Sequence, residues 1–410
     1  MGTQIAAKHD FTAKLRQESL LPKVMSYVNW QRSVRKARNL GATPLALPDN
    51  FGLVSMNLDL TIACNYKCPH CIDLAALNGP ERYKADELLC SLGHLIERGL
   101  CSVILIGGGE PTVYPKFRET VRFLKERGVA VGIVSNGSRN HLIHDIIDCL
   151  DERDWVRLSL DSGTNDTFMR MHKPLKGVSL EGICEWIPKI RAKNPRVPIG
   201  FSFIVTWKGA KNSQEETIVE NIGEIAVAAE LARKSSFTYI SYKAFLTRES
   251  NGAEVMDVEE VEHLEQTMRR IDAEVAQAES LSTPEFKILR STNLTVLLEN
   301  RWRELTKQPH MCHMMAFRQV LSPLGVYNCP AHRGEKKARI AGAQAFLDPS
   351  AFVDTNAALS GMLENFDAAH ECRNVTCLYN SANHWLEGLV AGDADTSSVE
   401  ALPDRGDYFL

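Results

Sequence analysis

The sequence predicts an α/β protein with a parallel sheet, followed by a smaller C-terminal region of different character. Between residues 56 and 245, six apolar segments alternate with amphipathic helical patterns. Apolar strands that alternate with helices are typical of a parallel sheet covered by helices, arranged as an open sheet or as a complete or partial barrel. After residue 250 the alternation stops, and charged helical patterns and a cysteine-flanked hairpin follow.

The individual elements follow from their apolar runs and helical periods. Strands are expected at 56–61, 102–106, 129–134, 156–160, 198–205 and 237–245. Helices between them are expected at 84–98, 116–127, 141–150, 180–193 and 215–233. The later patterns predict helices at 255–278, 293–307, 355–366 and 380–390, and a hairpin over 316–328.

Composition and charge exclude several classes of protein. Hydrophobic residues make up 44% of the 410-residue chain, which is enough for a large core and excludes a wholly disordered chain. The net charge of −4 does not favour nucleic-acid binding. Since no apolar run could span a bilayer and the N-terminus lacks the apolar core of a signal peptide, we expect a cytoplasmic protein without a membrane partner.

The eleven cysteines carry the strongest chemical signal. In a reducing compartment, clustered cysteines favour metal or redox roles over disulfides. Seven of them form an early group and a late group, which are Cys64, Cys68 and Cys71, and Cys312, Cys329, Cys372 and Cys377.

The early group fits a loop around one metal centre. A cubane 4Fe–4S cluster has four irons, so three thiolates leave one iron open to a non-protein ligand. A structural zinc site would need a fourth ligand, for which His70 is the nearest candidate. Packed cysteines without a metal are the remaining alternative.

The C-x3-C-x2-C spacing of this group, with Tyr66 two residues before the middle cysteine, resembles the signature of the radical S-adenosylmethionine (SAM) superfamily. The resemblance covers about residues 55–250 and implies a partial (β/α)6 TIM-like barrel. It also implies a 4Fe–4S cluster whose open iron is chelated by SAM, and an electron donor such as flavodoxin or ferredoxin. In such enzymes the cluster cleaves SAM to methionine and a 5′-deoxyadenosyl radical, which removes a hydrogen atom from the substrate.

Further motifs follow the second and third predicted strands. The segment from Gly107 to Pro111 resembles the GGEP motif, whose backbone binds the amino group of SAM. The expected contacts within it are Gly108, Gly109, Glu110 and Pro111. Ser135 and Asn136 resemble the turn after the third strand in that superfamily, and an ordinary Asn-Gly turn is the alternative.

Two more motifs follow the fourth strand. Ser159 and Asp161 share one strand face and resemble a motif that contacts the methionine and ribose of SAM. Arg170, with Lys173 as the competing residue, is expected to hold the SAM carboxylate, because a guanidinium forks around a carboxylate. All these motifs fall at the C-terminal ends of predicted strands, which is where parallel α/β folds bind ligands.

The late cysteine group resembles the twitch extension of radical SAM enzymes, a shortened relative of the SPASM domain. Two of its cysteines flank the predicted hairpin, and the other two follow a predicted helix. The resemblance implies one auxiliary 4Fe–4S cluster with four cysteine ligands. Structural zinc, with His313 and His332 nearby, and unligated cysteines remain alternatives.

These expectations divide the chain into five regions. They are a helical N-terminal arm (1–52), a radical SAM partial barrel (53–250), a helical connector (251–308), a twitch/SPASM-like α+β domain that binds the auxiliary cluster (309–390) and a flexible tail (391–410).

The expected reaction follows from the two cluster sites. An auxiliary cluster favours a substrate radical that loses one more electron, as in dehydrogenation of an alcohol, whereas epimerisation needs a hydrogen donor that none of the scattered cysteines is placed to provide. Lys243 on the sixth strand is the candidate base. The short N-terminal arm favours a small polar substrate such as a sugar, aminocyclitol or nucleoside, and a maturase that modifies a ribosomally made peptide is the alternative.

Overall fold

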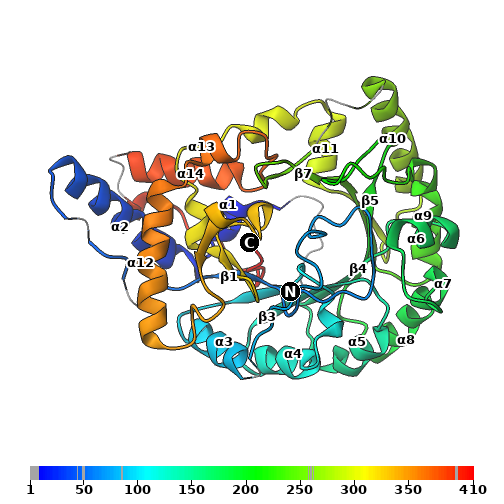
Figure 1. Cartoon of the computed structure of the whole chain (residues 1–410), viewed down its shortest axis with the longest axis horizontal. Helices are drawn as coiled ribbons and strands as arrows, with labels where there is room; N and C mark the ends of the chain where they lie inside the picture. The colour runs from blue at the N-terminus through cyan, green and yellow to red at the C-terminus, as the bar shows by residue number, and fades with distance from the viewer. Residues whose placement is uncertain are drawn as a thin grey trace.

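The centre of the molecule is a curved, largely parallel sheet (Figure 1). The computed structural model describes residues 9–43, 45–48, 51–84, 86–256, 258, 261, 263–392 and 396–410. Within these residues the sheet has ten strands in the order β12-β11-β10-β1-β2-β3-β4-β5-β6-β9. The two edge strands of this described sheet do not pair with each other, so the barrel is open.

Six strands lie close to the positions that the apolar runs predict, and each pairs in parallel with the next. They are β1 (Ser55–Leu58), β2 (Ser102–Leu105), β3 (Ala130–Ser135), β4 (Trp155–Ser159), β5 (Ile199–Val205) and β6 (Tyr239–Ala244). In β4, Val156 and Leu158 are buried beneath the helices, while the alternate residues face the interior of the barrel.

The later strands extend this sheet at both edges. β9 (Lys287–Arg290) pairs in parallel with β6. The predicted hairpin is confirmed as β10 (Arg318–Ser322) and β11 (Gly325–Tyr327), with β12 (Arg339–Ala341) beside it. Because β10 pairs in parallel with β1, the C-terminal extension continues the barrel sheet. A separate short ribbon is formed by β7 (Thr247–Arg248) and β8 (Glu254–Val255).

Helices cover the outer face of the curved sheet (Figure 1). They are α3 (Glu87–Glu97), α4 (Phe117–Glu126), α5 (Asn140–Ile146), α6 (Asn165–His172), α7 (Leu180–Cys184), α8 (Trp186–Lys193), α9 (Ile225–Lys234) and α10 (Leu264–Glu279). In α4 the buried residues Phe117, Val121 and Leu124 recur every three or four positions, which places them on the face toward the sheet.

Three predicted helices are shorter than their patterns indicate. The helix expected at 215–233 begins at Ile225, because the side chain of Asn221 binds the backbone at Thr206 and Asp161 and holds the preceding segment as a loop. The helix expected at 255–278 begins at Leu264. The helix expected at 293–307 ends at Leu298 as α11 (Thr292–Leu298).

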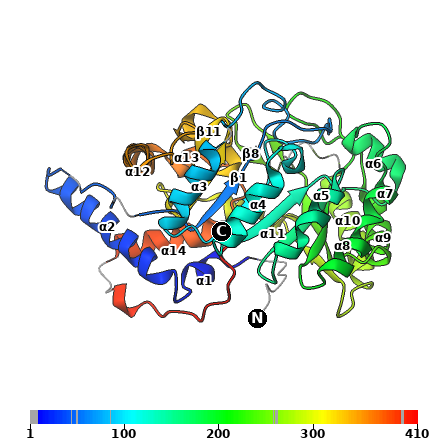
Figure 2. The ribbon, with the colours of Figure 1, turned by 90° about the horizontal axis from the view of Figure 1, so that it is seen from below.

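The remaining helices gather beside β1 and β10 (Figures 1 and 2). They are α1 (Phe11–Leu15), α2 (Leu21–Asn39), α12 (Pro349–Asn365), α13 (Ala368–Glu371) and α14 (Asn380–Ala391). The 3-10 turns are Pro111–Val113, Ile147–Cys149, Ile222–Glu224, Trp302–Thr306, His313–Ala316, Pro330–His332, Lys336–Ala338 and Thr396–Ser398. Across the described residues, no helix combines the length and apolar character that a membrane crossing requires.

The last residues of the chain form the floor of the barrel, which differs from the expected flexible tail. The backbone N–H of Leu410 donates to Ser55 Oγ, and Ser102 Oγ donates to the carbonyl of Tyr408, so the segment lies against the starts of β1 and β2 (Figure 2). Phe409 packs on Trp155 at the start of β4, with ring centroids 5.5 Å apart. Buried apolar side chains in this segment explain why it is ordered.

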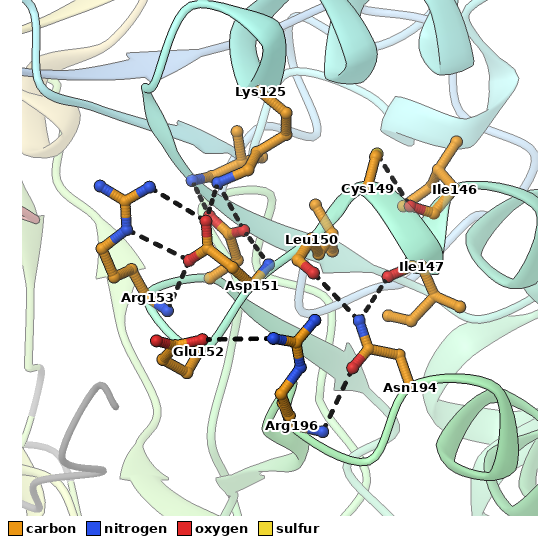
Figure 3. A network of polar contacts seen from close by, with 12 residues as sticks. Lys125, Ile146, Ile147, Cys149, Leu150, Asp151, Glu152, Arg153, Asn194 and Arg196 are labelled. Carbon is orange, nitrogen blue, oxygen red and sulfur yellow. Dashed lines mark hydrogen bonds and ion pairs between the residues drawn. The ribbon is translucent and has the colours of Figure 1, made fainter. Parts of the chain in front are cut away.

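A buried polar network fixes the turns on this lower side of the sheet (Figure 3). The Nζ of Lys125 lies 2.9 Å from Asp151 and 2.7 Å from Asp154. Asp154 also accepts hydrogen bonds from the backbone N–H groups of Val131 and Asp151, which joins β3 to the turn before β4. Asn194 donates to two carbonyl groups of the 147–150 turn. These contacts stabilise the turns at the N-terminal ends of the strands, which we call the lower side of the barrel. The functional motifs lie at the C-terminal ends of the strands, which we call the upper side.

Candidate functional site

One cavity of about 630 Å³ occupies the interior of the barrel and reaches from the upper strand ends to the floor. It is lined by nearly all of the residues that the sequence predicts for binding of the first cluster and SAM, together with the candidate base. These are Cys64, Cys68, Cys71, Gly108, Gly109, Glu110, Pro111, Ser135, Asn136, Ser159, Asp161 and Lys243. Its volume lies in the range of small-molecule sites in proteins.

The three early cysteines lie in the irregular segment between β1 and α3 and are partly buried. Burial, and then the charge of Asp73, raises the pKa of Cys71 to about 12, and burial also raises the pKa of Cys64 and Cys68. These thiols therefore become ligands only when a metal centre displaces their protons.

The spacing of these sulfurs does not match a single zinc ion. Two thiolates on one tetrahedral zinc ion would lie about 3.8 Å apart. The compact group of metal-ligand atoms found among the described residues, all within 4.8 Å, consists of Cys68, His70 and His172 and omits the other two cysteines. His70 is in addition bound to Asp161, at 3.1 Å. The wider spacing of the three cysteines fits ligands to different irons of a cluster.

The glycine segment after β2 lies directly against the cysteine loop. The backbone N–H of Gly109 donates to the carbonyl of Thr61, at 2.7 Å. A Cβ at position 109 would lie 2.0 Å from the carbonyl oxygen of Ala63, so only glycine allows this approach. The neighbouring N–H of Gly108 donates to Asp73. The glycines thus form a backbone cradle, called the glycine cradle below, against the cysteine loop.

Glu110 holds this cradle to the turn after β3. Its buried carboxylate accepts hydrogen bonds from Thr112, from Ser135 Oγ at 2.8 Å and from the N–H of Asn136 at 2.7 Å. Asn136 in turn donates from its side chain to Asn65 in the cysteine loop. The GGEP-like and Asn-Gly segments therefore form one connected structure around the upper rim of the cavity.

Asp161, just past the end of β4, orients two histidines beside Cys68. Its Oδ2 lies 3.1 Å from His70 Nε2 and 3.4 Å from His172 Nε2, and its Oδ1 accepts from the N–H of Ile204. Burial acts to raise the pKa of Asp161, but the hydrogen bond and charge of His70 hold this pKa below its usual value. Nδ1 of His172 lies 3.3 Å from Cys68 Sγ. Asp161 therefore links the motif at the end of β4 to the cysteine loop.

The structure does not bring Arg170 to the cavity. Arg170 lies on α6 with its side chain half exposed, and it pairs with Asp166 one helical turn away. The competing residue Lys173 pairs with Glu216 on the surface. Both side chains are thus engaged away from the cavity, because this part of α6 presents them to solvent.

Lys243 lies inside the cavity, as predicted, and its Nζ donates to Ser202 Oγ at 3.0 Å. Burial, and then the charge of Arg157, lowers the pKa of Lys243 well below its usual value. Sequence reasoning missed Arg157 as a cavity residue. Its position between Trp155 and Ser159 on the inward face of β4 is the period-two signal that could have identified it.

The four late cysteines come together from separate elements. Cys312 precedes β10, Cys329 follows β11, and Cys372 and Cys377 lie between α13 and α14. Burial, followed by the charges of the other three cysteines, raises the pKa of Cys372. No three of these sulfurs lie within 4.8 Å of one another, although all four belong to the described residues. This spacing is wider than one tetrahedral zinc ion requires.

The two histidines near the late cysteines have different partners. His313 is held by Tyr27 and Glu387, at 2.8 and 2.9 Å. His332 Nε2 lies 3.3 Å from Cys372 Sγ alone. Arg318, at the start of β10, is buried beside Cys329 and Cys377 and lines the main cavity. A buried cation in this place suits a group of thiolates that carries net negative charge.

Sequence comparisons agree with this geometry. Residues 58–221 match the model of the Radical SAM superfamily. A stretch of 189 residues is 26% identical to an S-adenosylmethionine-dependent nucleotide dehydratase of Psychrobacter lutiphocae, covering 42% of this chain and 60% of that protein. A stretch of 115 residues is 33% identical to the mycofactocin maturase MftC of Mycobacterium ulcerans, covering 27% of this chain and 30% of that protein. The chain thus spans less than two thirds of the length of either relative.

The fold is similar to that of SuiB from Streptococcus suis, whose crystal structure contains S-adenosylmethionine. The TM-score is 0.57 at 15% sequence identity, and the match covers 92% of this chain and 81% of that chain. Within residues 58–221 the chain matches the radical SAM superfamily, and this match implies a 4Fe–4S cluster and SAM as cofactors.

Proposed function

We propose that this protein is a radical SAM enzyme that oxidises, by dehydrogenation, or rearranges a small polar metabolite of the sugar, aminocyclitol or nucleoside type. When bound, the cluster and SAM supply a 5′-deoxyadenosyl radical that removes a hydrogen atom from the substrate. The observation that carries the proposal is the single cavity that joins the cysteine loop, the glycine cradle and the polar inward faces of β4, β5 and β6.

The residues of the upper rim fit these cofactors. Cys64, Cys68 and Cys71 would hold three irons and leave the fourth without a protein ligand. The close backbone approach at Gly109 leaves no room for a side chain between cradle and cluster loop, which supports a ligand bound by main-chain groups.

The lower part of the cavity supports a small substrate. Phe409 and Leu410 close its lower end, and Tyr239, Ser241 and Ser202 supply polar groups along one wall. Burial lowers the pKa of Lys243, which lies in contact with Ser202, and a lowered pKa favours a role of this amine as the acceptor of a proton from a substrate hydroxyl.

The late cysteines support an auxiliary 4Fe–4S cluster as electron relay. Oxidation of an alcohol after loss of a hydrogen atom requires the loss of one further electron and one proton, so an acceptor for each is needed near the substrate. Arg318 lies between the late cysteines and the cavity, which brings the two sites together.

Iron content tests the cluster assignment. Anaerobically reconstituted protein should hold about eight irons per chain, and Cys372→Ala should hold about four. Cys90→Ala is the matched control, because Cys90 is exposed and lies outside both groups. A wild-type content of about four irons would remove the auxiliary cluster from the proposal.

Substrate candidates are tested by hydrogen transfer. Deuterated sugars, aminocyclitols and nucleosides should transfer deuterium into 5′-deoxyadenosine, while peptides should not. The alternative, a maturase acting on a ribosomally made peptide, draws support from the mycofactocin maturase relative. Deuterium transfer from a labelled peptide alone would establish that alternative in place of the small-molecule proposal.

A further inference from the structure

Arg157 lies in the interior of the barrel and forms no ion pair with any residue that the structure describes. Its Nε is shielded from solvent and has no hydrogen-bond partner in the described part of the chain. Its guanidinium lies 5.2 Å from the ring of Trp155, which supports it from below. A guanidinium has five N–H donors, and a shielded donor without an acceptor costs free energy.

Two other arginines with little exposure, Arg333 and Arg248, have carboxylate partners, whereas Arg318 beside the late cysteines shares with Arg157 an Nε without a hydrogen-bond partner among the described residues. Arg333 lies 3.1 Å from Asp59 and 2.7 Å from Asp73, and Arg248 lies 3.3 Å from Glu254. The acidic side chain whose charge acts on Arg157 is Asp161, and that carboxylate is already bound by His70 and by the backbone of Ile204. Asp161 therefore does not serve as a dedicated ion-pair partner of Arg157.

The neighbouring strands leave space in front of this cation. Arg157 of β4, Gly200 of β5 and Tyr239 of β6 are directly paired in register. A Cβ at position 200 would lie 2.1 Å from Cζ and 2.5 Å from Oη of Tyr239, so the tyrosine ring crosses the glycine toward Arg157. Both side chains line the cavity. A guanidinium and a phenol O–H converging over a glycine form a set of donors for an oxyanion.

We propose that Arg157 and Tyr239 bind an oxyanion of the substrate, a carboxylate or a phosphate, in the lower half of the cavity. The inference rests on the proposed function and narrows the substrate to an acidic metabolite. Such a ligand would also complete the hydrogen bonds of this partly buried arginine, whose Nε has no partner among the described residues.

This subsite is distinct from the glycine cradle, where SAM is expected to bind. Arg157 lies two residues below Ser159 on β4, a distance of about 7 Å along the strand. The cysteine loop and the glycine cradle contact the opposite, upper ends of the strands. Lys243 also lies higher, level with Ile204, so the oxyanion would be held below the candidate base. The reacting carbon would then lie between the acidic group and SAM.

Binding of simple ions tests the subsite in the reconstituted protein with SAM present. Sodium phosphate and sodium acetate are titrated separately against sodium chloride at equal ionic strength, and apparent Kd values are taken from the rise in Tm. The wild type should be stabilised by phosphate or by acetate beyond chloride, and the more effective ion identifies the class of acidic group. Arg157→Gln should weaken that binding at least tenfold, and Tyr239→Phe several-fold.

The matched control is Arg118→Gln on α4, an exposed arginine paired with Asp145, which should bind the ion as the wild type does. Arg157→Lys, which keeps the charge, should retain part of the binding and serves if the glutamine variant does not fold. Equal ion binding by wild type and the Arg157 variants, or no stabilisation beyond chloride, would overturn the proposal. An equal loss of SAM affinity in Arg157→Gln would also overturn it, by placing this arginine in the SAM site.

The test separates this inference from the proposed function. Formation of 5′-deoxyadenosine by the dithionite-reduced protein without substrate reports the radical chemistry, and ion binding reports the subsite. Cleavage without ion binding would leave the enzyme class intact and remove the oxyanion subsite. Ion binding without SAM cleavage would support the oxyanion subsite and remove the assignment to the radical SAM enzymes.

Discussion

Nη1 of Arg333 lies 2.7 Å from Oδ2 of Asp73, and this ion pair joins the two cysteine regions. Asp73 follows Cys71 in the early cysteine loop and also accepts from the N–H of Gly108. Arg333 follows Cys329 of the late group and makes a second ion pair with Asp59. The position of the glycine cradle thus depends on a residue of the C-terminal extension.

Arg333→Met should therefore lower the free energy of unfolding strongly. The change leaves Asp59 and Asp73 buried without their cation, and breaking a buried ion pair from one side costs about 3–5 kcal/mol. Urea unfolding of the apoprotein measures the change. Lys173→Gln, which breaks an exposed pair with Glu216, is the control and should cost less than about 1 kcal/mol. Equal losses in the two variants would contradict this role of Arg333.

Asp59 should give stability a recognisable pH dependence. Burial, partly offset by Arg333, raises the pKa of Asp59 to about 7, whereas in the unfolded chain an aspartate loses its proton near pH 4. Between these pH values the native state holds a proton that the unfolded state has lost, so this contribution to stability falls as the pH rises. Relative to Asp59→Asn, the wild type should lose about 1.4 kcal/mol per pH unit in this window. Parallel pH profiles of the two proteins would show that the carboxyl is ionised in both states.

Gly109→Ala should impair SAM binding. The added methyl group would lie 2.0 Å from a backbone oxygen of the cysteine loop, so the cradle or the loop must shift. We expect at least a tenfold rise in the Kd for SAM, measured by equilibrium dialysis on reconstituted protein. Gly361→Ala on α12 is the control, since no atom lies within 4 Å of the added methyl group. Unchanged SAM affinity in Gly109→Ala would show that the cradle tolerates displacement.

Phe409→Ala should weaken the floor of the barrel. Phe409 is buried and packs on Trp155, and truncation of a buried phenylalanine costs about 3–5 kcal/mol. Thermal or urea unfolding should show this loss, while Leu40→Ala, at a side chain that is 73% exposed, should change stability little. Equal stability of Phe409→Ala and wild type would mean that the C-terminal segment does not hold its place in solution.

The barrel could be predicted because its strands are continuous apolar runs separated by amphipathic helices. The same periodicity placed the motifs at the upper strand ends, where the structure shows the cavity. The parallel pairing of β10 with β1 could not be predicted, since it joins residues about 260 positions apart through hydrogen bonds that leave no local pattern. The order of the tail was missed for a related reason: its apolar residues find partners only in the folded barrel.

Site residues were harder to predict when their role depends on whether the side chain faces the cavity or the solvent. Arg170 has the expected residue type near the expected place, but its position on α6 turns it toward solvent. Arg157 was overlooked because an arginine inside a strand is usually a surface residue. The domain boundaries and the ligand roles of the individual residues stay predictions.

The central claim is that Cys64, Cys68 and Cys71 hold the cluster at which SAM is cleaved. The most direct measurement is 5′-deoxyadenosine formation from SAM by the reduced, reconstituted protein, compared between wild type, Cys68→Ala and the exposed control Cys90→Ala. The wild type and Cys90→Ala should form 5′-deoxyadenosine at equal rates, and Cys68→Ala should form none. Formation of 5′-deoxyadenosine by Cys68→Ala at the wild-type rate would contradict the assignment of this cysteine loop.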